Sequence, residues 1–154
     1  MASRAVTLVL SVMFSSFAVA ASAGEFEGNW KLNLAKSKIR SEYMSYTMVI
    51  ELVGPNSYHI VYEMVTKTGE KRRPEITLIY DGKDRPVQNG PAGTTQINER
   101  PDPSTWKSTN HRNGKVVSEL IAVVAADNKT HTATRQSLGG DGRFVEEVFF
   151  FDRQ

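Results

Sequence analysis

Four tyrosines and one tryptophan are the side chains in this sequence best suited to bind a small molecule. In residues 46–52 and again in residues 58–64 every second residue is aromatic or aliphatic, which predicts two antiparallel strands with one face turned inward. The candidate ligand-binding residues on this and later strands are Tyr46, Tyr58, Tyr62, Tyr80 and Trp106. Hydroxyl groups among apolar walls are typical of small-molecule sites. An interior filled completely by these rings is the open alternative.

Glu146 is the candidate residue for acid–base chemistry. It shares one face of the last expected strand with Phe144, Val148 and Phe150, so we expect its carboxylate to point inward. A carboxyl group among apolar side chains can act as a general acid or base, or it can bind a polar group of a ligand. An ion pair between Glu146 and Arg135 on the neighbouring strand is the simpler expectation.

Histidine and cysteine usage excludes several other kinds of chemistry. His59, His111 and His131 lie on different expected strands without metal-ligand spacing, so each is expected at the surface. The sequence has no cysteine, which excludes disulfides, thiolate metal sites and a lipid-bearing cysteine. It has no Gly-x-Ser-x-Gly elbow. We therefore predict no catalytic triad, no metal site and no cofactor.

The run Phe149-Phe150-Phe151 makes the last expected strand apolar on both faces. If Phe150 faces inward with Glu146, then Val145, Phe149 and Phe151 face outward. An exposed apolar strip of this kind indicates an interaction surface. We therefore expect a homodimer formed through the C-terminal strand.

Regularly spaced turn residues divide the chain into about nine or ten strands without a long helix. The clearest turns are Gly54-Pro55-Asn56, Asp81-Gly82 and Asn113-Gly114. Residues 35–45 are expected to form a loop, and residues 86–103, with four of the six prolines, form the least regular part. This pattern favours an all-β, single antiparallel up-and-down barrel over a sandwich.

Gly28 and Trp30 stand at the start of the first expected strand, two residues apart and therefore on the same face. Trp30 is large enough to seal one end of a barrel, and its indole N–H needs a partner when buried. A glycine at position 28 allows close backbone approach or a sharp bend. Arg153, just beyond the last apolar strand, is the candidate cation to stack on the indole. These three residues are expected to close the barrel structurally.

The run Phe26-x-Gly-x-Trp-Lys-Leu resembles the opening of fatty-acid-binding proteins, within the lipocalin-like calycin superfamily. Residues 28–38, Tyr80-Asp81-Gly82-Lys83-Asp84 and Asn113-Gly114-Lys115 also resemble exported bacterial lipocalin-like proteins of undefined function. The resemblance implies a lipocalin-like β-barrel of about 8–10 strands with an interior for a small molecule. Two features of fatty-acid-binding proteins are missing, since residues 35–45 are too short for a helix pair and no Arg-x-Tyr occurs. Their ligand is therefore not carried over.

Residues 1–23 have the pattern of a secretory signal peptide. Arg4 gives the positive start, residues 5–20 the apolar centre, and Ala21-Ser22-Ala23 a small-residue cleavage site. Cleavage after Ala20 is the alternative. We expect a mature domain of residues 24–154 that is secreted or periplasmic and has no integral membrane segment after processing.

The formal net charge of +2 is nearly balanced and gives no reason to expect a nucleic-acid partner. Three functions follow from these features. The leading one is an exported protein that holds a small apolar or amphipathic molecule in a barrel cavity. The alternatives are an isomerase or cyclase in which Glu146 or a tyrosine moves protons, and a non-catalytic interaction protein of the envelope.

Overall fold

Eleven β-strands form the regular structure in the computed structural model, which describes residues 25–40, 42–88 and 90–154. The strands are β1 (Gly28–Leu32), β2 (Tyr43–Gly54), β3 (Ser57–Thr66), β4 (Lys71–Arg72), β5 (Glu75–Ile79), β6 (Asp84–Pro86), β7 (Thr94–Asp102), β8 (Thr105–Arg112), β9 (Lys115–Val124), β10 (Thr130–Leu138) and β11 (Phe144–Arg153). The predicted all-β fold is confirmed. The two shortest strands, β4 and β6, span too few residues to show an alternating pattern in the sequence.

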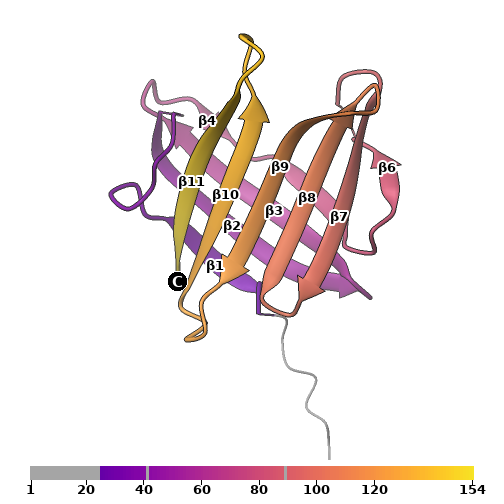
Figure 1. Cartoon of the computed structure of the whole chain (residues 1–154). Helices are drawn as coiled ribbons and strands as arrows, with labels where there is room; N and C mark the ends of the chain where they lie inside the picture. Colours follow the sequence, from indigo (N-terminus) through magenta and orange to yellow (C-terminus); the bar gives the residue numbers. More distant parts are fainter. Residues whose placement is uncertain (1–24, 41, 89) are drawn as a thin grey trace, which may run out of the picture.

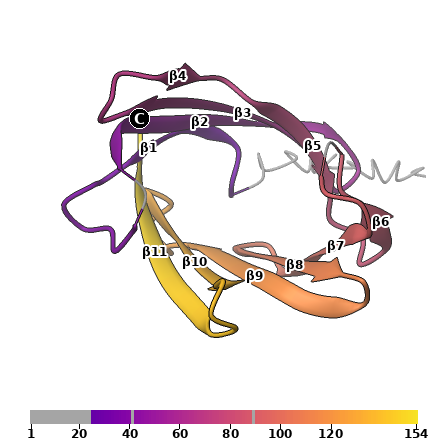
Figure 2. The ribbon, with the colours of Figure 1, turned by 90° about the horizontal axis from the view of Figure 1, so that it is seen from above.

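The strands form one antiparallel sheet in the order β4-β3-β2-β1-β11-β10-β9-β8-β7-β6, and β5 also pairs with β3 (Figure 1). Because β1 pairs with β11, the first and the last strand are neighbours in the middle of this sheet. The sheet curls into a barrel when it is viewed from above (Figure 2). Within the described residues no ladder joins β5 to β6, so the barrel keeps an open seam between these strands.

One end of the barrel is closed by Trp30. Its side chain is 1% exposed, and its Nε1 donates to the carbonyl oxygen of Phe26 at 2.8 Å. The guanidinium carbon of Arg153 lies 4.1 Å from the centre of the Trp30 rings. Arg153 also donates to the carbonyl oxygens of Glu25, Glu27 and Asn128. The cation therefore covers the indole and binds the backbone of two loops at once.

The inner face of β11 is formed by Glu147, Phe149 and Phe151, so the expectation that Phe149 and Phe151 face outward is wrong. Phe151 is 2% exposed and pairs with Leu32 of β1. The sequence could not indicate this because three consecutive phenylalanines show no alternation, and the pairing with β1 selects the face.

The outer face of β11 is partly covered by the loop that follows β1. Lys38 forms a β-bridge with Val148, and the Lys36 ammonium lies 4.6 Å from the Phe150 ring centre. The apolar strip expected from Phe149 is therefore not on the surface. This removes the structural ground for the homodimer expected through this strand.

Replacing Gly28 with alanine should destabilise the barrel. Its φ is +122°, and an added Cβ would lie 2.6 Å from Nη1 of Arg153. We expect Gly28→Ala to lower the free energy of unfolding by about 3 kcal/mol, because backbone strain and displacement of Arg153 act together. Urea unfolding measures this loss.

Gly114→Ala is the matched control. Its φ is +75°, but nothing lies within 4 Å of an added Cβ. Only backbone strain remains there, so a loss of about 1 kcal/mol is expected. Equal losses in the two variants would contradict the role given to Arg153.

Candidate functional site

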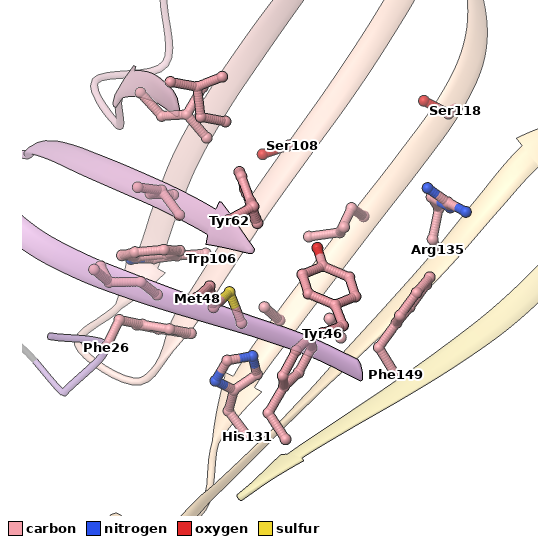
Figure 3. Close-up of a pocket in the computed structure, with 18 of the residues that line it drawn as sticks. Phe26, Tyr46, Met48, Tyr62, Trp106, Ser108, Ser118, His131, Arg135 and Phe149 are labelled. Carbon is pink, nitrogen blue, oxygen red and sulfur yellow. The ribbon is translucent and has the colours of Figure 1, made fainter. Parts of the chain in front are cut away.

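The barrel encloses a cavity of about 350 Å³ between its two curved halves (Figure 3). One side, the apolar wall, comes from β2, β3 and β5 and is formed by Met48, Ile50, Ile60 and Leu78. The opposite side, the polar wall, comes from β7 to β10 and is formed by Gln96, Ser108, Asn110, Ser118 and Ser137. The cavity therefore offers apolar surface to one side of an occupant and hydrogen-bonding groups to the other.

The cavity has a closed aromatic end and a more open polar end. Phe26 and Trp106 at the aromatic end stack with ring centres 3.9 Å apart and an interplanar angle of 15°, and both are buried. At the polar end Arg135 and Ser118 lie on neighbouring strands (Figure 3), and the Arg135 side chain is 39% exposed. Solvent therefore reaches the cavity from the polar end.

Four of the five expected aromatic residues line this cavity: Tyr46, Tyr62, Tyr80 and Trp106. Tyr58 does not line it. The Tyr58 ring packs 4.7 Å from that of Trp106, and its hydroxyl accepts a hydrogen bond from Nη1 of Arg100 at 2.6 Å. The structure thus brings most of the expected residues together and places Tyr58 beneath the aromatic end as part of the core.

Burial keeps the cavity tyrosines protonated. Desolvation raises the pKa of Tyr62 to about 12. It also raises the pKa of Tyr46 and Tyr80 well above the usual tyrosine range, with a smaller contribution from neighbouring tyrosines. Tyr46 and Tyr62 both line the cavity and carry their hydroxyl protons. Each can therefore donate one hydrogen bond to an occupant.

Glu146 lies on the outer face of β11, so the expectation that it points into the barrel is wrong. It is exposed and accepts a hydrogen bond from Gln136. The error has the same cause as that for Phe149, because both faces of β11 are apolar in sequence. The neighbouring Glu147 is the carboxylate turned inward, and it is 8% exposed.

Glu147 pairs with Arg135, its direct partner across β10 and β11. The second carboxylate oxygen accepts the backbone N–H of Arg40 at 2.8 Å. Burial by itself raises the pKa of Glu147, but the hydrogen bonds from Arg135 and Arg40 outweigh it and lower the pKa below its usual value. Arg135 therefore lines the cavity while its positive charge is paired with the carboxylate of Glu147.

His131 lines the aromatic end of the cavity, which corrects the expectation that it lies at the surface. It is 2% exposed, and its ring centre lies 4.5 Å from that of Trp30. Desolvation, helped by the charge of Arg153, lowers the pKa of His131 to about 3. The imidazole is therefore neutral at physiological pH.

Sequence reasoning missed the polar wall as well as His131. Ser108 and Asn110 follow Trp106 at intervals of two residues on β8, so all three lie on the same face. Placing Trp106 in the interior therefore predicts that Ser108 and Asn110 also face inward. Ser108 donates to Oδ1 of Asn98 at 2.7 Å, and Asn110 donates to Oγ of Ser118 at 2.8 Å. These bonds between neighbouring strands hold the polar groups in place.

Neither a metal cluster nor a membrane helix occurs in the part of the chain that the structure describes. Within residues 25–40, 42–88 and 90–154, no three His, Asp or Glu side chains converge as metal ligands do. In the same residues no helix has the length and hydropathy of a membrane span.

The chain matches no known family by sequence and no curated protein, but its fold is shared by solved structures. A Schistosoma mansoni fatty-acid-binding protein in complex with arachidonic acid has a TM-score of 0.59 at 16% identity, over 86% of this chain and 98% of that one. The fluorescent protein UnaG has a TM-score of 0.58 at 13% identity, over 84% of this chain and 98% of that one. At these identities the likeness shows the fold alone, an antiparallel β-barrel like those of the two solved structures.

Burial of neutral His131 predicts a loss of stability in acid. The unfolded chain gains a proton at this residue below pH about 6.5, whereas the folded chain gains it only near pH 3. The contribution of neutral His131 to the free energy of unfolding is complete above pH 6.5 and is lost as the pH falls. The loss between pH 7 and pH 5 is about 2 kcal/mol. Urea unfolding at both pH values should show a smaller loss in His131→Phe than in the wild type. Equal losses would contradict this assignment.

Proposed function

We propose that the protein is an exported small-molecule-binding protein that holds an apolar or amphipathic ligand inside its barrel. The cavity of about 350 Å³ is the observation on which this proposal depends. Small-molecule sites usually enclose about 300–1,000 Å³, and most of their lining is apolar. The interior is therefore large enough for a ligand instead of being filled by its own rings.

The arrangement of the cavity supports an amphipathic ligand. An apolar body can contact the apolar wall and the rings of the aromatic end, while a polar group can meet Tyr46, Asn110 or Ser118 nearer to solvent. Burying a ligand's apolar surface contributes about 25 cal/mol per Å². The fold likeness to a fatty-acid-binding protein in complex with arachidonic acid supports the same use of the interior.

The two alternatives have less support. The isomerase or cyclase hypothesis assigned proton transfer to Glu146 or to a tyrosine. Glu146 lies on the outer face, Glu147 is held in an ion pair with Arg135, and burial raises the pKa of the cavity tyrosines well above neutral pH. The envelope-interaction hypothesis depended on the last strand and on the basic run at residues 71–73, and Phe149 of that strand is buried. A binding protein without catalysis therefore fits the cavity best.

Export is the part of the proposal that depends on sequence alone. Residues 1–23, the expected signal peptide, lie outside the described residues. Their charged start, apolar centre and small-residue end support delivery of residues 24–154 to the periplasm or the medium. The ligand would then be bound outside the cytoplasm.

Filling the cavity should abolish binding. Ala133 on β10 lines the cavity next to its strand partner Ala122 on β9. In Ala133→Phe the new ring would project into the cavity. We expect the affinity for the uncharged dye Nile red to fall more than tenfold, because the dye loses the volume that it occupies. Fluorescence titration measures this, and circular dichroism verifies the fold.

Thr132→Phe is the matched control. Thr132 is the preceding residue, pairs with Phe150 and Val123 on the outer face, and does not line the cavity. Its dye affinity should stay within threefold of the wild type. Nile red binding that survives in folded Ala133→Phe would show that the dye binds elsewhere and would refute the cavity assignment.

A further inference from the structure

We infer that the cavity selects an uncharged amphipathic molecule, such as an alcohol, amide or ester, over the corresponding carboxylate. This inference rests on the proposed function and specifies the class of its ligand. The observation behind it is the pairing of the charged groups at the polar end of the cavity.

Arg135 is the one charged side chain among the described residues that line the cavity, since His131 is neutral. Its Nη2 donates to Oε2 of Glu147, which is 8% exposed. The Arg135 guanidinium also lies 5.1 Å from the Phe149 ring centre. The cation is thus held between its counter-charge and an aromatic ring before any ligand arrives.

A ligand carboxylate that approached Arg135 would have to compete with Glu147. Displacing Glu147 would leave a buried carboxylate without its cation, and sharing the guanidinium would bring two carboxylates together. Either outcome weakens binding by about tenfold or more. Arg40 also faces Glu147, but its side chain is exposed, so solvent screens its charge.

The remaining polar groups of the cavity are uncharged. Tyr46 and Tyr62 present protonated hydroxyls, and the polar wall presents amide and hydroxyl groups such as those of Asn110 and Ser118. Groups of this kind can hydrogen-bond to a hydroxyl, amide or ester oxygen of a ligand without breaking the ion pair between Arg135 and Glu147. The chemistry of the wall and the compensated charge of Arg135 therefore point to the same class of ligand.

Decanol and decanoate test this inference because they share one chain and differ in the head group. Each competes with Nile red at pH 8, where decanoate is ionised. We expect decanol to bind at least tenfold more tightly than decanoate. Decanoate that binds as tightly as decanol, or more tightly, would overturn the inference while leaving the proposed function in place.

Glu147→Gln shows whether the ion pair is the cause. The substitution removes the competing carboxylate and leaves Arg135 free, so affinity for decanoate should rise at least tenfold while affinity for decanol changes less than threefold. Glu146→Gln is the control, since it makes the same change one residue away on the outer face. A gain for decanoate in both variants, or in neither, would contradict the inference.

The double variant Arg135→Gln with Glu147→Gln removes both charges at once. It tests the same inference if Glu147→Gln alone does not fold. It should show no gain in affinity for decanoate relative to decanol, since the freed guanidinium is absent. A gain for decanoate in the double variant would overturn the assignment to Arg135. If Nile red, decanol and decanoate all fail to bind the folded wild type, the proposed function itself fails.

Discussion

The contact between Arg153 and Trp30 is the interaction on which the barrel depends. The two residues are direct partners across β1 and β11, so the contact also joins the first strand to the last. A partly exposed cation over an indole contributes about 1 kcal/mol, and charge-assisted hydrogen bonds to carbonyl oxygens add to it. Since the carbonyl oxygens belong to residues before β1 and before β10, one side chain holds three parts of the chain together.

This junction also decides which side chains reach the interior. The register that pairs Trp30 with Arg153 pairs Leu32 with Phe151 and turns Glu147 inward. A shift of one residue would expose Phe151 and bring Glu146 into the barrel. The chemistry of the cavity therefore follows from a register set at the opposite end of the barrel, where the aromatic rings exclude water.

The sequence predicts the strands better than it predicts their faces. Turn residues with positive φ, such as Asn113 and Gly114, mark hairpins locally, and a hairpin joins β8 to β9 at this turn. Alternation also selects Tyr46, Tyr62 and Trp106 for the interior. It fails at β11, which is apolar on both faces, and at β10, which is mostly polar in sequence. Only long-range pairing resolves these positions, and no local pattern encodes it.

The open seam is the one place in the described barrel wall where neighbouring strands are not paired. One hydrogen bond from Gly82 to Asn98 ties the turn after β5 to β7, and beyond it the described residues of β5 and β6 share no ladder. Spreading these edges disturbs the side chains of Ile76, Leu78 and Gln96 but breaks no strand pairing. Widening the interior at this seam would therefore break no strand pairing, whereas widening it at the sealed end would break the contacts of Arg153 with Trp30 and with three carbonyl oxygens.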